Sequence, residues 1–193
     1  MRVGVLDVQG NVAEHVNALA GITRGGSVLR VKDSKSILSL DALVIPGGES
    51  TTIGKLIVKY DLDKTIRDFA AEGKPIMGTC AGMIVLAKRG GVEVEKTGQP
   101  LLGLMDATVS RNAFGRQRES FEAELAIKGF STPFHGIFIR APAITEVGKG
   151  VVVLSEFDGK IVMARQKNLL ALSFHPELSG DQRVHDYFLS MVR

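Results

Sequence analysis

Residues 74–83 read Lys74-Pro75-Ile76-Met77-Gly78-Thr79-Cys80-Ala81-Gly82-Met83, a short apolar run that ends at a cysteine between two glycines. The run predicts a buried strand over 74–78, and the residues after it predict a helix over 81–89. A strand that turns this tightly into a helix needs small neighbours, so the pattern indicates a nucleophile elbow with Cys80 at its tip. The start of a helix favours the thiolate over the thiol, and the N–H of Ala81 can face a developing oxyanion.

The first half of the chain alternates short apolar runs with helical patterns. It predicts strands over 2–8, 28–31, 42–45 and 74–78, and helices over about 50–60, 62–72 and 81–89. Asn11 is the predicted cap of a further, first helix, because Glu14 follows three residues later. This rhythm is typical of a parallel sheet that is covered on both faces.

The second half is rich in strand patterns, which fall at 107–110, 120–128, 134–139, 151–157, 160–166 and 169–174. Asp158-Gly159 predicts a type I′ hairpin turn between two of them. An amphipathic helix is predicted over 183–192. We therefore expect one domain, residues 1–193, in the α/β class, with a mixed sheet between helices.

A partner for the cysteine follows the strand predicted over 169–174, in the triplet His175-Pro176-Glu177. A thiol nucleophile needs a base, and the base needs a third group that fixes its tautomer. A His-x-Glu triplet alone is weak evidence, but Cys80 and His175 both follow predicted strands, where open α/β sheets place their sites.

The remaining histidines have no such context. His15 and His185 lie in predicted helices, and His135 lies in the strand-rich region. We interpret all three as surface or packing residues.

A glycine turn, Pro46-Gly47-Gly48-Glu49-Ser50-Thr51-Thr52, follows the strand predicted over 42–45. Paired glycines let backbone amides approach a ligand, so the amide of Gly48 could complete an oxyanion hole with that of Ala81. For this segment alone, a plain strand–helix turn is slightly the better explanation. A phosphate loop does not explain it, because the spacing to Gly54-Lys55 is too long by one residue and Leu56 stands where that motif needs Ser or Thr.

Composition excludes several classes of function. The net charge is only +3, the basic residues are scattered and tryptophan is absent, so binding to nucleic acid is not expected. No apolar run has the roughly 18 residues that span a membrane, and no signal peptide is recognised. A single cysteine rules out an internal disulfide and fits the cytoplasm.

The three motifs together resemble the signatures of class I glutamine amidotransferases, in the expected order along nearly the whole chain. Three segments resemble the glutaminase of pyridoxal 5′-phosphate synthase in particular: Gly47 to Thr52, Arg111 to Gln117 with Ser120 to Glu122, and Phe138 to Pro142. The resemblance implies a three-layer, flavodoxin-like open sheet and no cofactor or metal.

The resemblance also implies roles for individual residues. The triad falls on Cys80, His175 and Glu177, and the oxyanion donors on Gly48 and Ala81. The glutamine contacts fall on Gly48, Glu49, Ser50, Arg111, Ile139 and Arg140, and Gln9 matches a position that responds to partner docking. The implied partner is a TIM-barrel synthase that receives ammonia through a channel.

Other functions remain as alternatives. A glutaminase could serve a different synthase, such as that of histidine or purine synthesis. A metal or redox module could use Cys80, His175 and Glu177, although structural zinc sites have closer spacing and no second cysteine could resolve an oxidised one. A regulatory subunit without catalysis is disfavoured by the intact triad.

Overall fold

The strands and helices follow the predicted alternation in the first half of the chain. A computed structural model describes residues 1–23, 25–115 and 119–192. The strands are β1 (Arg2–Leu6), β2 (Ser27–Val31), β3 (Ala42–Ile45), β4 (Ile76–Thr79), β5 (Ala87–Gly90), β6 (Met105–Ser110), β7 (Ser120–Leu125), β8 (Phe134–Ile139), β9 (Ala143–Val147), β10 (Val152–Phe157), β11 (Lys160–Gln166) and β12 (Leu169–Leu172). The helices are α1 (Val12–Ala20), α2 (Ser34–Leu38), α3 (Ser50–Lys59), α4 (Leu62–Ala71), α5 (Ala81–Leu86), α6 (Val92–Thr97), the 3₁₀ turn η1 (Pro176–Leu178) and α7 (Arg183–Leu189).

A ten-stranded mixed sheet runs through the molecule in the order β2-β1-β3-β4-β12-β11-β9-β6-β5, with β10 paired to β11. The five strands from β2 to β12 are parallel. Strand β11 runs antiparallel to β12, β10 and β9. Because β3, β4 and β12 are parallel neighbours, the segments after them meet at one edge of the sheet, where open α/β folds bind ligands.

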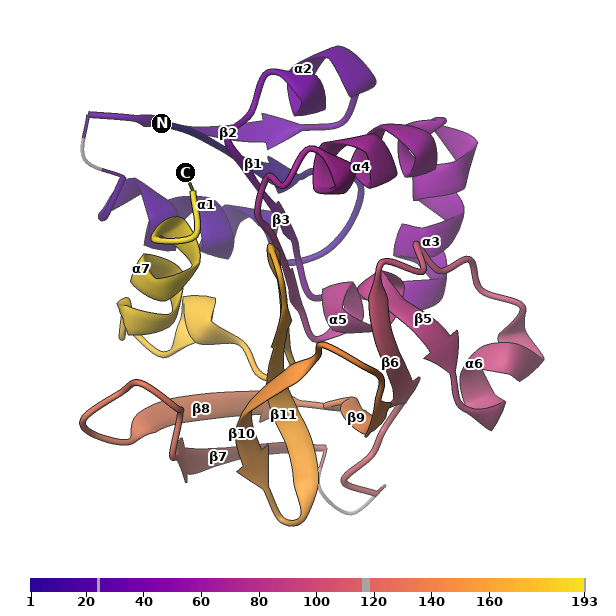
Figure 1. Ribbon diagram of the computed structural model, residues 1–193, viewed down its shortest axis with the longest axis vertical. Helices are drawn as coiled ribbons and strands as arrows, with labels where there is room; N and C mark the ends of the chain where they lie inside the picture. Colours follow the sequence, from indigo (N-terminus) through magenta and orange to yellow (C-terminus); the bar gives the residue numbers. More distant parts are fainter. Residues whose placement is uncertain (24, 116–118, 193) are drawn as a thin grey trace.

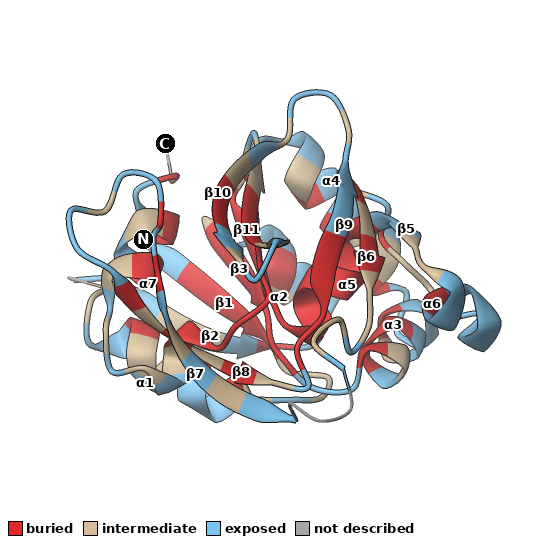
Figure 2. Ribbon diagram, turned by 90° about the horizontal axis from the view of Figure 1, so that it is seen from below, coloured by how far each residue is buried: buried red, intermediate tan, exposed pale blue. Residues whose placement is uncertain are grey.

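Helices cover both faces of the sheet. Figure 1 shows α1 and α7 on one side of the central strands, and α3, α4 and α5 on the other. Two apolar clusters form the core, and strand β3 contributes side chains to both. Leu43 and Ile45 pack in one cluster, and Ala42 and Val44 pack in the other. The four residues of β3 are all buried, as are those of β4 beside it and of β12 beyond β4 (Figure 2). The predicted fold class is confirmed.

A two-stranded hairpin, β7–β8, lies across the strand-rich end of the molecule (Figure 1). Its attachment is aromatic: the rings of Phe121 and Phe138, stacked on each other at 4.6 Å within the hairpin, lie 5.6 and 5.8 Å from the ring of Phe157 in β10. Offset aromatic pairs of this kind add to the stabilisation from buried area. The hairpin therefore has a fixed position, and it carries Ile139 at its end.

Some predicted boundaries were wrong. The helix expected over 81–89 ends at Leu86, and 87–90 form β5, which pairs with β6. The apolar residues Met83 to Ala87 are all buried. Their sequence therefore shows no periodic spacing of apolar and polar residues that would mark where the helix ends and the strand begins. Helices α2 and α6 and strand β9 were not predicted. The Asp158-Gly159 turn is confirmed, with positive φ of 51° and 68°.

None of the helices in the described ranges is long and apolar enough to cross a bilayer.

Candidate active site

Cys80 stands at the turn between β4 and α5 and has a strained backbone, with φ 49° and ψ −104°. This conformation lies outside the regions that are comfortable for a residue with a side chain, and such outliers cluster at functional sites. The flanking glycines allow the turn: a Cβ on Gly82 would lie 2.1 Å from the carbonyl oxygen of Ile45, and one on Gly78 would lie 2.6 Å from the carbonyl of Gly82. The predicted elbow is therefore present.

His175 reaches the same edge of the sheet from β12, which pairs in parallel with β4. Its backbone N–H donates to the carbonyl of Ile137 in β8 at 2.8 Å, so the hairpin fixes its main chain. Its Nδ1 lies 2.7 Å from Oε1 of Glu177, and both side chains are buried. A carboxylate only accepts hydrogen bonds, so Nδ1 carries the proton and Nε2 is left for the nucleophile.

The charges of this group stabilise one another. Burial works to lower the pKa of His175, but hydrogen bonds to Cys80 and Glu177 outweigh it and raise that pKa to about 10. Burial works to raise the pKa of Glu177, but the hydrogen bond from His175 and the nearby imidazoles lower it. At neutral pH His175 is therefore an imidazolium, hydrogen-bonded to the ionised carboxylate of Glu177.

The glycine turn lies against both reacting side chains. A Cβ on Gly47 would lie 2.6 Å from Cε1 of His175 and 3.4 Å from Cβ of Cys80. The next residue, Gly48, has φ 158°, and the side-chain oxygen of Gln9 accepts the N–H of Glu49 at 2.9 Å. The loop therefore needs glycine because catalytic side chains approach its backbone closely.

One cavity of about 430 Å³ collects almost all of the residues expected at the site. Its lining comprises Gln9, Asn11, Gly48, Glu49, Ser50, Cys80, Ala81, Ile84, Arg111, Asn112, Ile139, Arg140, Pro142 and His175. Of the expected residues only Glu177 is absent from this lining, because it is buried behind His175. Arg116 and Gln117 of the motif that begins at Arg111 lie outside the described residues.

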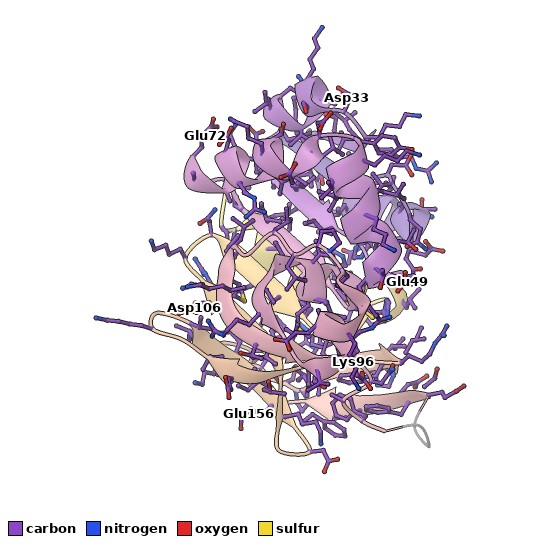
Figure 3. All side chains as sticks on the ribbon, turned by 90° about the vertical axis from the view of Figure 1, so that its right-hand side faces the viewer. Asp33, Glu49, Glu72, Lys96, Asp106 and Glu156 are labelled. Atoms are coloured by element: carbon purple, nitrogen blue, oxygen red, sulfur yellow. The ribbon has the colours of Figure 1, made fainter. Side chains whose placement is uncertain are left out.

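Glu49 and Arg111 pair with each other across the cavity wall, with 3.0 Å between Nη2 of the arginine and Oε1 of the carboxylate. Glu49 also caps α3, where it accepts the N–H groups of Thr51 at 3.1 Å and Thr52 at 2.7 Å. Although burial opposes it, these hydrogen bonds lower the pKa of Glu49 to about 2. Figure 3 shows Glu49 where the violet elements of the first half meet the pink and tan elements of the second half.

Two polar residues near the site were missed by sequence reasoning. Asn11 occupies the N-cap position of α1 as predicted, but its side chain makes no cap hydrogen bond; its Nδ2 donates to Oε1 of Glu177 at 3.4 Å instead. Gln99 is buried, and its side-chain oxygen accepts from Ser50 at 3.0 Å and from Arg111 at 3.4 Å. No local signal could have found either contact, because each joins distant segments.

The histidine predictions were partly wrong. His15 and His185 are buried, as packing residues are, but Nε2 of His15 lies 3.3 Å from Oε2 of Glu177. They therefore belong to the surroundings of the site. His135 lies on the exposed face of the hairpin, paired with Glu122 and Glu124 at 2.9 and 2.8 Å.

A larger cavity of about 630 Å³ lies between 126–133 and 153–156. It is away from Cys80, and neither cysteine nor histidine lines it, so the smaller cavity is the better candidate for chemistry. Within the described parts of the chain, no group of three or more His, Cys, Asp or Glu side chains could hold a metal ion.

Solved structures place this fold in one class. A crystal structure titled as that of a glutamine amidotransferase is 46% identical to the chain, superposes with a TM-score of 0.91 and covers 98% of both chains. A structure titled PurLQS from Thermotoga maritima has a TM-score of 0.70 at 15% identity, covering 100% of this chain and 98% of that one, which shows the shared fold alone. The α/β fold is thus that of a glutamine amidotransferase, a hydrolase that acts on the side-chain amide of glutamine.

The family within that class follows from sequence. The chain belongs to the SNO glutamine amidotransferase family, whose model matches residues 5–193. It is 54% identical to the pyridoxal 5′-phosphate synthase subunit PdxT of Methanococcoides burtonii, covering 100% of this chain and 99% of that protein. It is 55% identical to the protein of the same name from Methanocella arvoryzae, covering 100% and 98%.

Proposed function

We propose that Cys80, His175 and Glu177 are the triad with which this chain hydrolyses glutamine, and that the released ammonia supplies the synthesis of pyridoxal 5′-phosphate. The chain is a glutaminase by family, and relatives over half identical are named as subunits of that synthase. One observation carries the assignment of the triad. Cys80 and His175, 95 positions apart in sequence, both lie against Gly47, and Nδ1 of His175 is 2.7 Å from Oε1 of Glu177.

The chemistry is acyl transfer through a covalent intermediate. The Cys80 thiolate attacks the side-chain amide carbon of glutamine, and the oxygen becomes an oxyanion facing the amides of Gly48 and Ala81. His175 donates its proton to the leaving ammonia, which leaves a γ-glutamyl thioester on the sulfur. His175 then takes a proton from water, which attacks the thioester and releases glutamate.

The cavity provides both charges that an amino acid requires. Arg111 and Arg140 can bind the α-carboxylate, and Glu49 can accept the α-ammonium. Glu49 and Arg111 pair with each other, so we propose that glutamine inserts its own two charges between them. Gly48, Ser50 and Ile139 complete the proposed subsite.

A partner gives the ammonia a protected route, because free ammonia is largely protonated near neutral pH and escapes into solvent. We propose that the chain acts as one domain, in the cytoplasm, docked on a TIM-barrel synthase subunit that receives the ammonia. A glutaminase that serves the synthase of histidine or purine synthesis is the alternative, and binding of the chain to one purified synthase and not the others distinguishes them.

The central test is Cys80→Ala in the full chain with the synthase subunit present. We expect glutamate release to be abolished, because the chain has no other cysteine. Labelling by a glutamine-like electrophile should disappear as well. Hydrolysis that survives in this variant would overturn the triad.

Gln9 is the proposed link between docking and the oxyanion loop, because its side-chain oxygen holds the N–H of Glu49 next to Gly48. Gln9→Ala should lower synthase-stimulated turnover while the melting temperature stays the same. The measurement is glutamate release with and without the synthase subunit. Unchanged stimulation would remove Gln9 from the activation step.

A further inference from the structure

The carboxylate of Glu177 has a second side that the triad does not use. Its Oε1 faces His175 at 2.7 Å and Asn11 at 3.4 Å. Its Oε2 is buried and, among the described residues, accepts no well-aligned hydrogen bond. The nitrogen that the structure places beside it is Nε2 of His15, 3.3 Å away, and both side chains are fully buried. A buried carboxylate oxygen needs a donor, since an unpaired one is costly.

His15 also contacts the residue before the nucleophile. It lies on α1, and its Nε2 is 3.0 Å from Oγ1 of Thr79 at the end of β4. Its other ring nitrogen, Nδ1, lies 3.5 Å from Nε2 of His185 on α7. One imidazole thus lies between the strand that presents Cys80 and the acid that orients His175.

The positions of the protons follow from the groups involved. A carboxylate oxygen 3.3 Å away would repel a lone pair, so the hydrogen of the His15 ring lies on Nε2, where it donates to Oγ1 of Thr79 at 3.0 Å beside Oε2 of Glu177. Burial is the largest influence on the pKa of His15 and lowers it, so the ring is neutral and Nδ1 is a lone pair. That lone pair accepts the Nε2–H of His185.

His185 completes the same pattern. Burial lowers its pKa to about 4, so it too is neutral and carries one ring proton. With that proton on Nε2, its Nδ1 is a lone pair, and Nδ1 is the buried nitrogen that has no partner in the described chain. The opposite tautomer would bury an N–H without an acceptor, so this arrangement is the favourable one.

We infer that His15 is a positioning residue for glutamine hydrolysis: its Nε2–H, which bonds Thr79 and lies 3.3 Å from the second oxygen of Glu177, holds that carboxylate in place, so that Glu177 keeps Nδ1 of His175 protonated and the ring aimed at Cys80. The inference rests on the proposed triad. His185 contributes by holding His15 in the required tautomer. Helix α1 thereby acts on the acid of the triad through Asn11 and His15.

The test compares His15→Leu, which removes the donor, with His15→Gln, which keeps an N–H at the end of a side chain of similar reach. His135→Leu and His135→Gln are matched controls, because His135 also pairs with glutamates but is exposed on the hairpin. All variants are made in the full chain and assayed with the synthase subunit. Glutamate release gives kcat and KM, and thermal unfolding reports on folding.

We expect His15→Leu to lower kcat by on the order of ten- to a hundredfold, the factor that corresponds to one hydrogen bond to a charged group. KM for glutamine should stay unchanged, because His15 is not among the residues that line the cavity. His15→Gln should recover most of the loss, and neither control should change kcat.

Alkylation by iodoacetamide gives a second readout, because Cys80 is the only cysteine. The charged and titratable groups that face His15 are Glu177, His175, His185 and Glu14. Without the His15 donor, Glu177 supports the imidazolium less well, so the pH at which alkylation becomes fast should rise in His15→Leu. It should stay in place in His15→Gln and in the His135 controls. A merely structural role would not move it.

Each outcome decides something. Equal losses in His15→Leu and His15→Gln, with an unmoved alkylation profile, would overturn the positioning role. Normal kcat in His15→Leu, while Cys80→Ala and Glu177→Gln are inactive, would overturn it and leave the triad intact. Activity in Cys80→Ala would instead overturn the proposed function. If His15→Leu does not fold, His185→Leu replaces it: a rise in the alkylation pH supports the inference, and no rise overturns it.

Discussion

Cys80 has one of several left-handed backbones around the cavity. Its φ is 49°, and the lining residues Asn112 and Arg140 have φ of 48° and 43°. Each costs on the order of 1–3 kcal/mol in a residue with a side chain, so the surrounding structure must hold all three in place. Strain of this kind aims the sulfur and the guanidinium at a common space, where the substrate is proposed to bind.

Gly47 tests how closely the site is packed. In Gly47→Ala the new Cβ would lie 2.6 Å from Cε1 of His175, so the ring must move away from Cys80. We expect kcat to fall by at least about a hundredfold, as a displacement near 1 Å in an active site can do. Glutamate release and circular dichroism measure the loss and the retained fold.

Gly91→Ala is the matched control for that change. Its φ of −71° suits alanine, and the new Cβ would make an ordinary contact of 3.4 Å. It should keep full activity. Equal activity in both variants would show that His175 does not lie where the structure places it.

At the scale of elements, the β7–β8 hairpin forms part of the cavity wall although its strands do not pair with those of the ten-stranded sheet. Phe121 and Phe138 attach it to β10, and the backbone of His175 is bonded to Ile137 in β8. The carbonyl of Ile139, at the end of the same strand, lies 3.8 Å from the sulfur of Cys80. The aromatic cluster therefore positions both the base and the roof of the site.

Phe138→Ala tests whether the aromatic cluster both stabilises the fold and positions the end of the hairpin. Phe138 is fully buried, so its truncation should lower the free energy of unfolding by about 3–5 kcal/mol. It should also raise KM for glutamine, because Ile139 and Arg140 follow directly in the chain. Urea unfolding and steady-state kinetics measure the two effects; a stability loss with unchanged KM would show that the hairpin end is fixed by other contacts.

At the scale of the whole molecule, buried histidines make stability depend on pH. The pKa of His185 is about 4 in the folded chain and about 6.5 when it is exposed. As pH falls from about 6.5 to 4, the unfolded chain takes up a proton that the folded chain refuses, so stability is lost on acidification. His15 contributes to the same loss of stability on acidification, since burial lowers its pKa too.

His185→Leu should reduce this loss. At about 1.4 kcal/mol for each pKa unit, the wild-type chain loses roughly 3 kcal/mol between pH 6.5 and 4 through His185, and the variant should lack that part. Urea unfolding at several pH values gives the slope. His135→Leu is the control, because Glu124 and Glu122 raise the pKa of His135, so its effect on stability has the opposite sign and is not lost on acidification. Parallel slopes in wild type and His185→Leu would contradict the assignment.

The sequence alone determined the elements that depend on neighbouring residues. Strand β3 was predicted at its observed bounds, because four consecutive buried residues are readable as an apolar run. The cysteine elbow was predictable from Gly78 and Gly82, since the turn itself demands small residues there. Only Pro176 separates His175 from Glu177, so the sequence by itself placed the base close to the acid.

Only the tertiary structure decided which polar side chains support that site. Asn11 and Glu177 are 166 positions apart, and His15 and His185 are 170 apart, so no local pattern links them. A histidine on a helix has the same sequence signature whether it faces water or a buried carboxylate. What distinguishes His15 is the packing of α1 and α7 on one face of the sheet, which brings its ring to Glu177 and excludes water from both.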